Sequence, residues 1–85
     1  MKPTAYTERI RSLREDADQT QKNIADLLGT SQTMYARYER GANELPIRHL
    51  IKLCKYYEVS ADYILGLIDF PKELQLRQHM PKNPH

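Results

Sequence analysis

Residues 31–41, SQTMYARYERG, combine side chains that can hydrogen-bond to nucleic-acid bases with two tyrosines three positions apart. On a helix that advances about 100° per residue, one arc carries only polar, basic or small side chains. This arc, here called the polar face, consists of Gln32, Thr33, Ala36, Arg37 and Arg40. Gln and Arg can form paired hydrogen bonds with adenine and guanine edges in the DNA major groove. The opposite arc holds Met34, Tyr35, Tyr38 and Glu39, so we expect the tyrosines to anchor the helix to a core.

A polar helix face is more often a solvated surface than a binding site, so this pattern alone leaves both interpretations open. The preceding segment changes the balance. Thr20 suits the N-cap of a short helix, Gly29 suits the left-handed residue that ends it, and Ser31 suits the next N-cap. Two short helices joined by residues 29–31 match a helix-turn-helix, in which the second helix enters the major groove.

Helical periodicity recurs along the rest of the chain, and no stretch alternates like a β-strand. We expect an all-α fold of five short helices, in about residues 6–17, 20–28, 31–40, 46–57 and 60–68. Residues 1–68 then form one compact domain. Residues 69–85 form a C-terminal extension, with one short helical turn followed by a disordered tail.

The composition sets further limits. The 85 residues carry a formal net charge of +2, which only weakly favours a polyanionic partner. The chain has neither an apolar run long enough to span a membrane nor the apolar centre of a signal peptide. Its single cysteine, Cys54, cannot form an internal disulfide. We therefore expect a cytoplasmic protein.

Three segments resemble a known family. RIRSLRED (9–16), TQKNIADLLGTSQTMYARYERG (20–41) and LIKLCKYYEVSADYILGL (50–67) are similar to phage repressor/Cro-type helix-turn-helix proteins, the Xre-like transcriptional regulators. The shared features are a glutamine that opens the second helix, a glycine in the turn and ERG at the end of the third helix. The resemblance implies a repressor-like five-helix fold, sequence-specific binding to double-stranded DNA and a homodimer on an inverted repeat.

The resemblance also implies roles for individual residues. The base-reading positions correspond to Gln32, Thr33, Ala36 and Arg37, with Ala36 touching a thymine methyl group. The positions that contact DNA phosphates correspond to Gln21, Arg40 and Asn43, and Gln21 would also support Gln32. Arg14 and Glu39 match a structural ion pair between the first and third helices; the alternative for Glu39 is a simple surface charge.

The chain departs from the family pattern at three places. Asp18-Gln19 replaces the usual Gly-Leu before the second helix, which weakens that corner although Asp tolerates a left-handed conformation. Glu58 stands where Gly or Asn often ends the fourth helix. Tyr35 and Tyr38 replace an aliphatic pair, so we expect their hydroxyls to reach an edge, water or a phosphate.

No constellation of residues indicates an enzyme, a metal site or a cofactor. His49, His79 and His85 have irregular spacing. Cys54 shares an arc with Ile47, Leu50 and Ile51, which favours a buried small hydrophobic residue, and the same wheel puts His49 on the opposite, polar face. Paired carboxylates and a glycine-rich phosphate loop are also missing from the sequence.

Two further surfaces leave alternatives open. Arg48, Lys52 and Lys55 form a basic face that is either merely solvated or attracts phosphates. The apolar segment 64–70 is either part of the monomer core or a dimer contact. A second function is therefore a protein-interaction module, such as an antitoxin or adaptor, that uses residues 64–70 with the helix-turn-helix as scaffold. RNA binding would need exposed aromatic side chains, whereas the tyrosines of 31–41 point inward.

Overall fold

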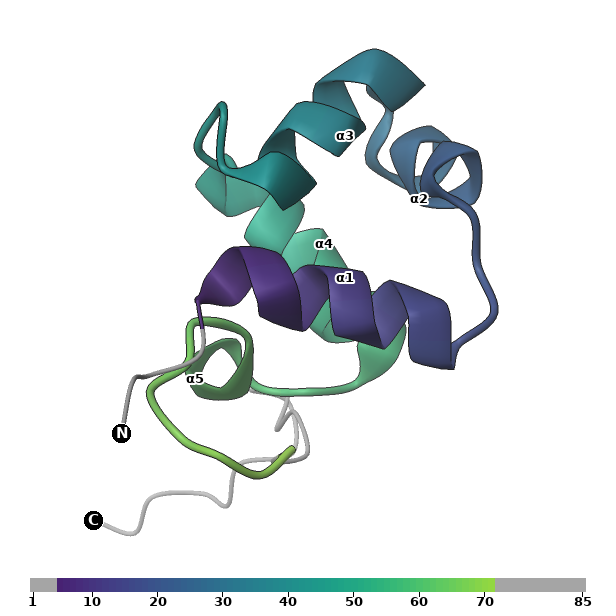
Figure 1. Ribbon diagram of the computed structural model, residues 1–85. Helices are drawn as coiled ribbons and strands as arrows, with labels where there is room; N and C mark the ends of the chain where they lie inside the picture. Colours follow the sequence, from purple (N-terminus) through teal and green to yellow (C-terminus); the bar gives the residue numbers. More distant parts are fainter. Residues whose placement is uncertain (1–4, 72–85) are drawn as a thin grey trace, which may run out of the picture.

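The computed structural model describes residues 5–71 and contains the five expected helices in this range (Figure 1). They are α1 (Tyr6–Asp16), α2 (Gln21–Leu28), α3 (Gln32–Arg40), α4 (Ile47–Tyr57) and α5 (Ala61–Ile64). The predicted all-α class and the helix-turn-helix of α2 and α3 are confirmed. None of the described helices is long and apolar enough to cross a membrane.

Local sequence sets the ends of α2 and α3. The Thr20 hydroxyl accepts a hydrogen bond from the backbone N–H of Asn23, and the Asn23 side chain accepts one from the backbone N–H of Thr20, both at 3.0 Å. The Ser31 hydroxyl caps α3 in the same way, through the N–H of Met34 at 3.0 Å. Gly29 ends α2 with φ of 73°, a left-handed conformation that suits glycine. The turn between the two helices is therefore specified by residues within it.

The core is shared by all five helices. In Figure 1, α1 runs between α3 on one side and α5 on the other, and it contacts both. The buried apolar residues come from all five helices and one loop: Ile10, Ile24, Ala25, Leu28, Tyr35, Tyr38, Leu53, Cys54, Val59 and Ile64. The predicted inward position of both α3 tyrosines is confirmed, and their rings meet edge to face with centroids 6.3 Å apart. Tyr35 and Tyr38 thus attach one side of α3 to the core.

The rotation of α4 differs from the prediction. His49, expected on the polar face, is buried at 5% exposure and packs edge to face on Tyr38, with ring centroids 5.8 Å apart. Ile47 and Ile51, expected inside with Cys54, are 73% and 50% exposed. Hydropathy alone puts isoleucine inside and histidine outside. In the structure, however, the imidazole of His49 packs against the Tyr38 ring. The rotation of α4 that brings His49 to this ring leaves Ile47 and Ile51 facing solvent.

The fifth helix is shorter than predicted. It ends at Ile64, and Gly66 then adopts φ of 82° while the N–H of Leu67 donates to the Asp62 carbonyl at 2.8 Å. The left-handed Gly66 and this hydrogen bond form a helix C-terminus, so residues 65–68 are not helical. The chain continues to Pro71 in turns and bends. The remainder of the expected extension, including His79 and His85, lies outside the described residues.

Several apolar side chains remain exposed beyond the core. We use the term apolar surface for Ile47, Ile51, Leu65, Leu67 and Phe70, whose exposures range from 44% to 73%. A neighbouring pocket is lined by Tyr6, Glu44, Leu45, Ile47, Leu50 and Leu65. Within segment 64–70, Ile64 therefore belongs to the core, whereas Leu65, Leu67 and Phe70 face solvent.

An arginine that sequence analysis missed ties α1 to α5. Arg9 is buried at 8% exposure, and its guanidinium carbon lies 3.9 Å from the centre of the Tyr63 ring. A cation over an aromatic face is attracted by the electron density of the ring. No sequence signal distinguishes Arg9 from the exposed arginines of the same helix, because its burial depends on a ring more than fifty positions away.

Candidate nucleic-acid interface

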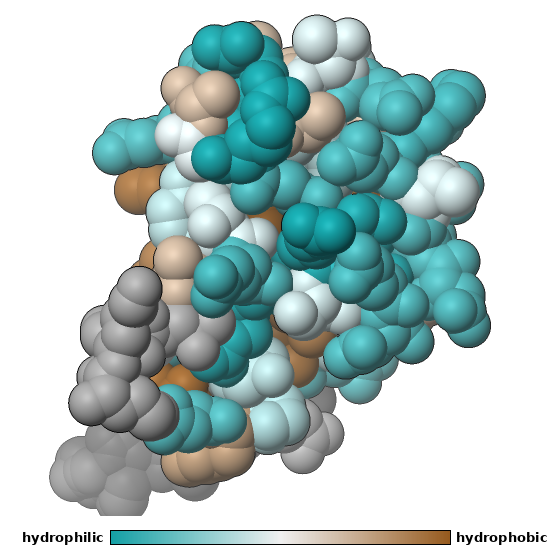
Figure 2. All heavy atoms as spheres, viewed as in Figure 1, coloured by the Kyte–Doolittle hydropathy of each residue, from teal (hydrophilic) through white to brown (hydrophobic). Residues whose placement is uncertain are grey.

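The polar face of α3 lies on the outside of the molecule. Gln32, Thr33 and Arg40 are exposed, and Ala36 and Arg37 are partly buried at its centre. Figure 2 shows a predominantly hydrophilic surface over α2 and α3. Because Tyr35 and Tyr38 hold the other side of the helix in the core, the polar face cannot turn inward. Its glutamine, threonine and arginine side chains project from a rigid support.

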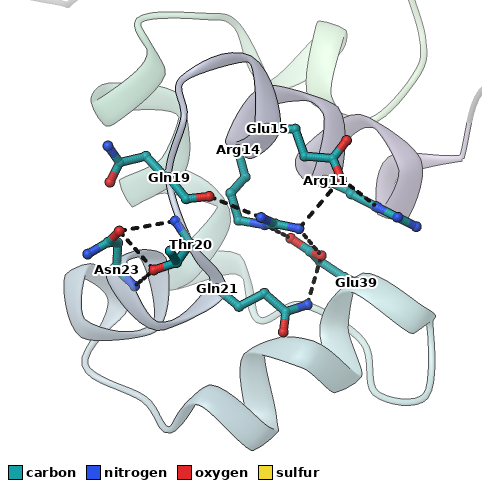
Figure 3. A network of polar contacts seen from close by, with 8 residues as sticks. All are labelled: Arg11, Arg14, Glu15, Gln19, Thr20, Gln21, Asn23 and Glu39. Atoms are coloured by element: carbon teal, nitrogen blue, oxygen red, sulfur yellow. Dashed lines mark hydrogen bonds and ion pairs between the residues drawn. The ribbon is translucent and has the colours of Figure 1, made fainter.

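A buried ion pair joins the first and third helices (Figure 3). The Nε of Arg14 donates to Oε2 of Glu39 at 2.7 Å, and its Nη2 donates to Oε1 at 3.1 Å. The side chains are only 13% and 4% exposed. The structure therefore brings together the two residues that the family resemblance paired, and Glu39 is not a simple surface charge.

Gln21, the first residue of α2, completes this contact. Its amide Nε2 donates to Oε1 of Glu39 at 3.1 Å, as Figure 3 shows. The side chain was expected to support Gln32, but its hydrogen bond goes to Glu39 instead. Glu39 thus accepts hydrogen bonds from both α1 and α2, and three helices meet at one carboxylate. We call Arg14, Gln21 and Glu39 the buried network.

Arg14 also supports the corner before α2. Its Nη1 donates to the backbone carbonyl of Gln19 at 3.0 Å, and Asp18 takes the left-handed conformation with φ of 56°. The corner that was expected to be weak, for lack of an apolar residue, is therefore held by a charged hydrogen bond. The sequence carries no signal for this role of Gln19, because its backbone carbonyl can accept the hydrogen bond from Arg14 whichever side chain the residue has.

The electrostatics of the buried network keep both partners charged. Burial by itself would raise the pKa of the Glu39 carboxyl, but hydrogen bonds from Arg14 and Gln21 and the charge of Arg14 outweigh burial and hold the pKa below its ordinary value. The hydrogen bond to Glu39 raises the pKa of Arg14 in turn. The carboxylate is neutralised within the protein and adds little negative potential to the polar face.

The hydroxyl of Tyr35 behaves differently from the expectation. It is buried next to the Glu39 carboxylate and does not reach the surface, so the prediction that it reaches an edge, water or a phosphate is wrong. Burial, followed by the neighbouring Glu39 carboxylate, raises the pKa of this hydroxyl well above its ordinary value. Tyr35 therefore stays protonated near pH 7. Its side chain is fully buried, so it serves as a core residue.

The C-terminal end of α3 brings two further candidates together. The Nε of Arg37 donates a hydrogen bond to Oδ1 of Asn43, in the loop that follows the helix. Arg40 is exposed in the last turn of α3. A predicted base-reading residue and a predicted phosphate-binding residue are therefore in direct contact.

Metal chemistry finds no support in the described part of the chain. Residues 5–71 contain no cluster of three or more His, Cys, Asp or Glu side chains that could hold an ion. Cys54 is buried, as predicted, and burial raises the pKa of its thiol. Burial, followed by repulsion from Arg48 and Lys52, lowers the pKa of His49. Both side chains are neutral core residues near pH 7.

A helix-turn-helix family model matches residues 10–64. The uncharacterized HTH-type transcriptional regulator YobD of Bacillus subtilis is 38% identical over 66 residues, which cover 78% of this chain and 59% of YobD. The cryptic phage CTXphi transcriptional repressor RstR of Vibrio cholerae is 35% identical over 72 residues, covering 82% and 64%. The chain thus spans about three fifths of the length of these curated relatives.

Among solved structures, the fold matches a crystal structure of the P22 c2 repressor in complex with a synthetic operator. The TM-score is 0.67 at 29% sequence identity, and the match covers 73% of this chain and 94% of the repressor chain. The similarity therefore extends over most of this chain.

The buried network yields a prediction about stability. Glu39→Gln leaves Arg14 without its counter-charge, so we expect the free energy of unfolding near pH 7 to fall by about 1–3 kcal/mol. Urea unfolding followed by circular dichroism measures this difference. The matched control is Asp26→Asn, which breaks an exposed pair with Lys22 and should change stability by about 0.5 kcal/mol or less.

The same variant tests the pH dependence. Since the folded-state pKa of Glu39 lies below 4.5, its stabilisation is complete above that pH and is lost as the pH falls through the folded-state pKa. The wild type should therefore lose more stability than Glu39→Gln when both are acidified from about pH 6 to about pH 3. Equal losses would mean that the ion pair contributes nothing to acid sensitivity.

Proposed function

The chain belongs to the helix-turn-helix family, as its resemblance to Xre-like regulators predicted, and on that premise we propose that it is a sequence-specific, double-stranded-DNA-binding transcriptional regulator. One observation carries the proposal: the polar face of α3 lies on the outside of the molecule, with side chains of the types that can contact bases, while Tyr35 and Tyr38 on its opposite side are buried in the core. The names of the relatives, an HTH-type regulator and a phage repressor, support it. In a bacterium such as those that carry YobD and RstR, a DNA partner would place the protein in the cytoplasm.

The recognition helix is α3, about residues 31–40, and it enters the major groove. Gln32 and Thr33 lie in its first turn and are exposed, where a recognition helix contacts base edges. Arg37 lies one turn later and reads a guanine, and the small Ala36 between them contacts a thymine methyl. The fixed inward side of α3 favours this assignment, because direct readout needs a helix that holds one orientation.

Phosphate contacts would come from the two ends of the helix-turn-helix. Gln21 opens α2, where free backbone N–H groups also favour an anion. Arg40 and Asn43 lie at and beyond the end of α3. The Arg14–Glu39 pair has a structural role in this scheme, since it supports Gln21 and keeps the Glu39 carboxylate away from the DNA.

We propose that the domain, residues 1–68, works as a homodimer on an inverted repeat. A net charge of +2 leaves one copy with few phosphate contacts, and affinity at physiological salt depends strongly on their number. The apolar surface of Ile47, Ile51, Leu65, Leu67 and Phe70 offers area for a second copy. Two recognition helices would then enter successive major grooves about 34 Å apart.

A second candidate function uses the same apolar surface differently. A protein-interaction module, such as an antitoxin or adaptor, would bind its partner through segment 64–70 and keep the helix-turn-helix as scaffold. The exposure of Leu67 and Phe70, at 71% and 60%, favours a partner of some kind. DNA binding and oligomeric state separate the two candidates.

The proposed function predicts the result of an in vitro selection. Purified protein mixed with random duplex DNA should enrich an inverted repeat whose half-sites lie about 10 base pairs, one helical turn, apart. Retained duplexes are sequenced after several rounds. A stable monomer that enriches no sequence would instead support the protein-interaction module.

Substitutions on the two sides of the interface should have different effects. Arg37→Ala should cost about 1–3 kcal/mol of affinity for the selected duplex and relax the preference at one base pair. Gln21→Ala should weaken binding to selected and random duplexes alike, because a phosphate contact carries no sequence information. Fluorescence anisotropy titrations with both duplexes measure these effects. A uniform loss in Arg37→Ala, or a selective one in Gln21→Ala, would contradict the assigned role.

The dimer has a separate test. Leu67→Asp adds a charge to an exposed position of the apolar surface, so it should shift the protein from dimer to monomer in sedimentation experiments and leave the unfolding temperature nearly unchanged. Ser12→Asp, which adds the same charge on an exposed position of α1, is the control and should stay dimeric. A wild type that is monomeric at all concentrations would exclude this interface.

A further inference from the structure

The loop after α3 is closely tied to the residue that we assign to base reading. Arg37 donates from Nε to Oδ1 of Asn43, and its backbone carbonyl accepts the N–H of Ala42 at 2.9 Å and that of Asn43 at 3.4 Å. Asn43 therefore meets Arg37 through both its side chain and its backbone. The contact spans six residues and is partly buried, unlike an exposed pair on one helix face.

The acceptor on Asn43 is held in place by the fold. Gly41 reverses the chain with φ of 78°, and its N–H donates to the Tyr38 carbonyl at 3.2 Å. Two residues beyond Asn43, the N–H of Leu45 donates to the Tyr6 hydroxyl of α1 at 3.2 Å. The loop is thus fixed at both ends, by a left-handed helix end and by α1. Oδ1 of Asn43 lies at a defined position relative to α3.

We propose that Asn43 is a positioning residue that orients the Arg37 guanidinium and thereby determines the base-pair preference of the protein. This inference rests on the proposed function, since it concerns how the same α3 face reads DNA. It assigns Asn43 a role in specificity in addition to the phosphate contact proposed above.

The chemistry of the guanidinium explains the effect. Arginine has five N–H donors in a planar fork, and Nε carries one of them. With Nε bound to Asn43, the side-on pair of Nε and one terminal nitrogen is no longer free. The two terminal nitrogens remain, and they can donate together to O6 and N7 of guanine. Asn43 thus selects the end-on mode and holds the long side chain in one orientation before DNA arrives.

The two roles of Asn43 use different atoms. Oδ1 accepts from Arg37, whereas the Nδ2 amide keeps its donors for a phosphate. A phosphate contact contributes equally to every DNA sequence, but an oriented guanidinium contributes only where guanine is present. The ratio of affinities for two duplexes that differ at one base pair therefore reports the positioning role alone.

The experiment uses the full chain and two duplexes. The first duplex is the one obtained by selection, and the second differs from it only at the base pair for which Arg37→Ala no longer shows a preference. Asn43→Ala should reduce the affinity ratio of the two duplexes about 3- to 10-fold, because the hydrogen bond that orients the guanidinium is lost while Arg37 itself remains. In the Arg37→Ala background, Asn43→Ala should leave the ratio unchanged. Circular dichroism checks that each variant folds, and Asn43→Ser, whose side chain is too short for the contact, is the second removal variant.

Two control variants separate acceptor from donor. Asn43→Asp keeps an oxygen for Arg37 but loses the amide donors, so it should keep the wild-type ratio while affinity for both duplexes falls. Arg40→Ala removes a proposed phosphate contact at a residue that has no hydrogen bond to Arg37. This variant should also keep the wild-type ratio of affinities for the two duplexes. Both results would locate the specificity effect at Oδ1 of Asn43.

Other outcomes would overturn the inference. An unchanged ratio in Asn43→Ala, or an equal reduction in the presence and absence of Arg37, would show that Asn43 does not act through this arginine. Either result would leave the proposed function intact, because the wild type would still prefer its selected duplex. A wild type without any preference would instead remove the proposed function and this inference together.

Discussion

One buried carboxylate links the three helices that carry and support the polar face. Glu39 of α3 accepts hydrogen bonds from Arg14 of α1 and Gln21 of α2, and Arg14 also holds the carbonyl before α2. Desolvating an ion pair costs about as much as its attraction returns, so its main effect is on geometry. Breaking it would leave a charge unpaired between three helices. The buried network therefore joins α1, α2 and α3 through hydrogen bonds that a shift of α2 or α3 would break.

The network also explains how one nine-residue helix can serve two purposes. Tyr35 and Tyr38 fill the core beneath it, while Gln32, Thr33 and Arg40 on the other side remain exposed. Glu39 lies at the boundary, where an unpaired carboxylate would repel a phosphate backbone; pairing with Arg14 removes that repulsion.

Surfaces of different chemistry lie at separate parts of the molecule. The polar face belongs to α3, whereas the apolar surface belongs to α4 and the chain after α5, and the view in Figure 2 is predominantly hydrophilic over α2 and α3. Such a separation allows a second protein copy to bind without covering the polar face. It also fits the low net charge, because a domain that gains affinity by pairing needs fewer basic residues in each copy.

The sequence by itself determined the features that depend on near neighbours in the chain. The caps at Thr20 and Ser31, the left-handed glycines and the helical period predicted α2, α3 and the two sides of α3. Only the tertiary structure decided the rotation of α4, with His49 inside and Ile47 outside, and the contacts of Arg9 and Asn43. A cap or a period acts within a few residues. Whether a histidine or an arginine is buried depends on which ring or carbonyl the fold brings to it from far along the chain.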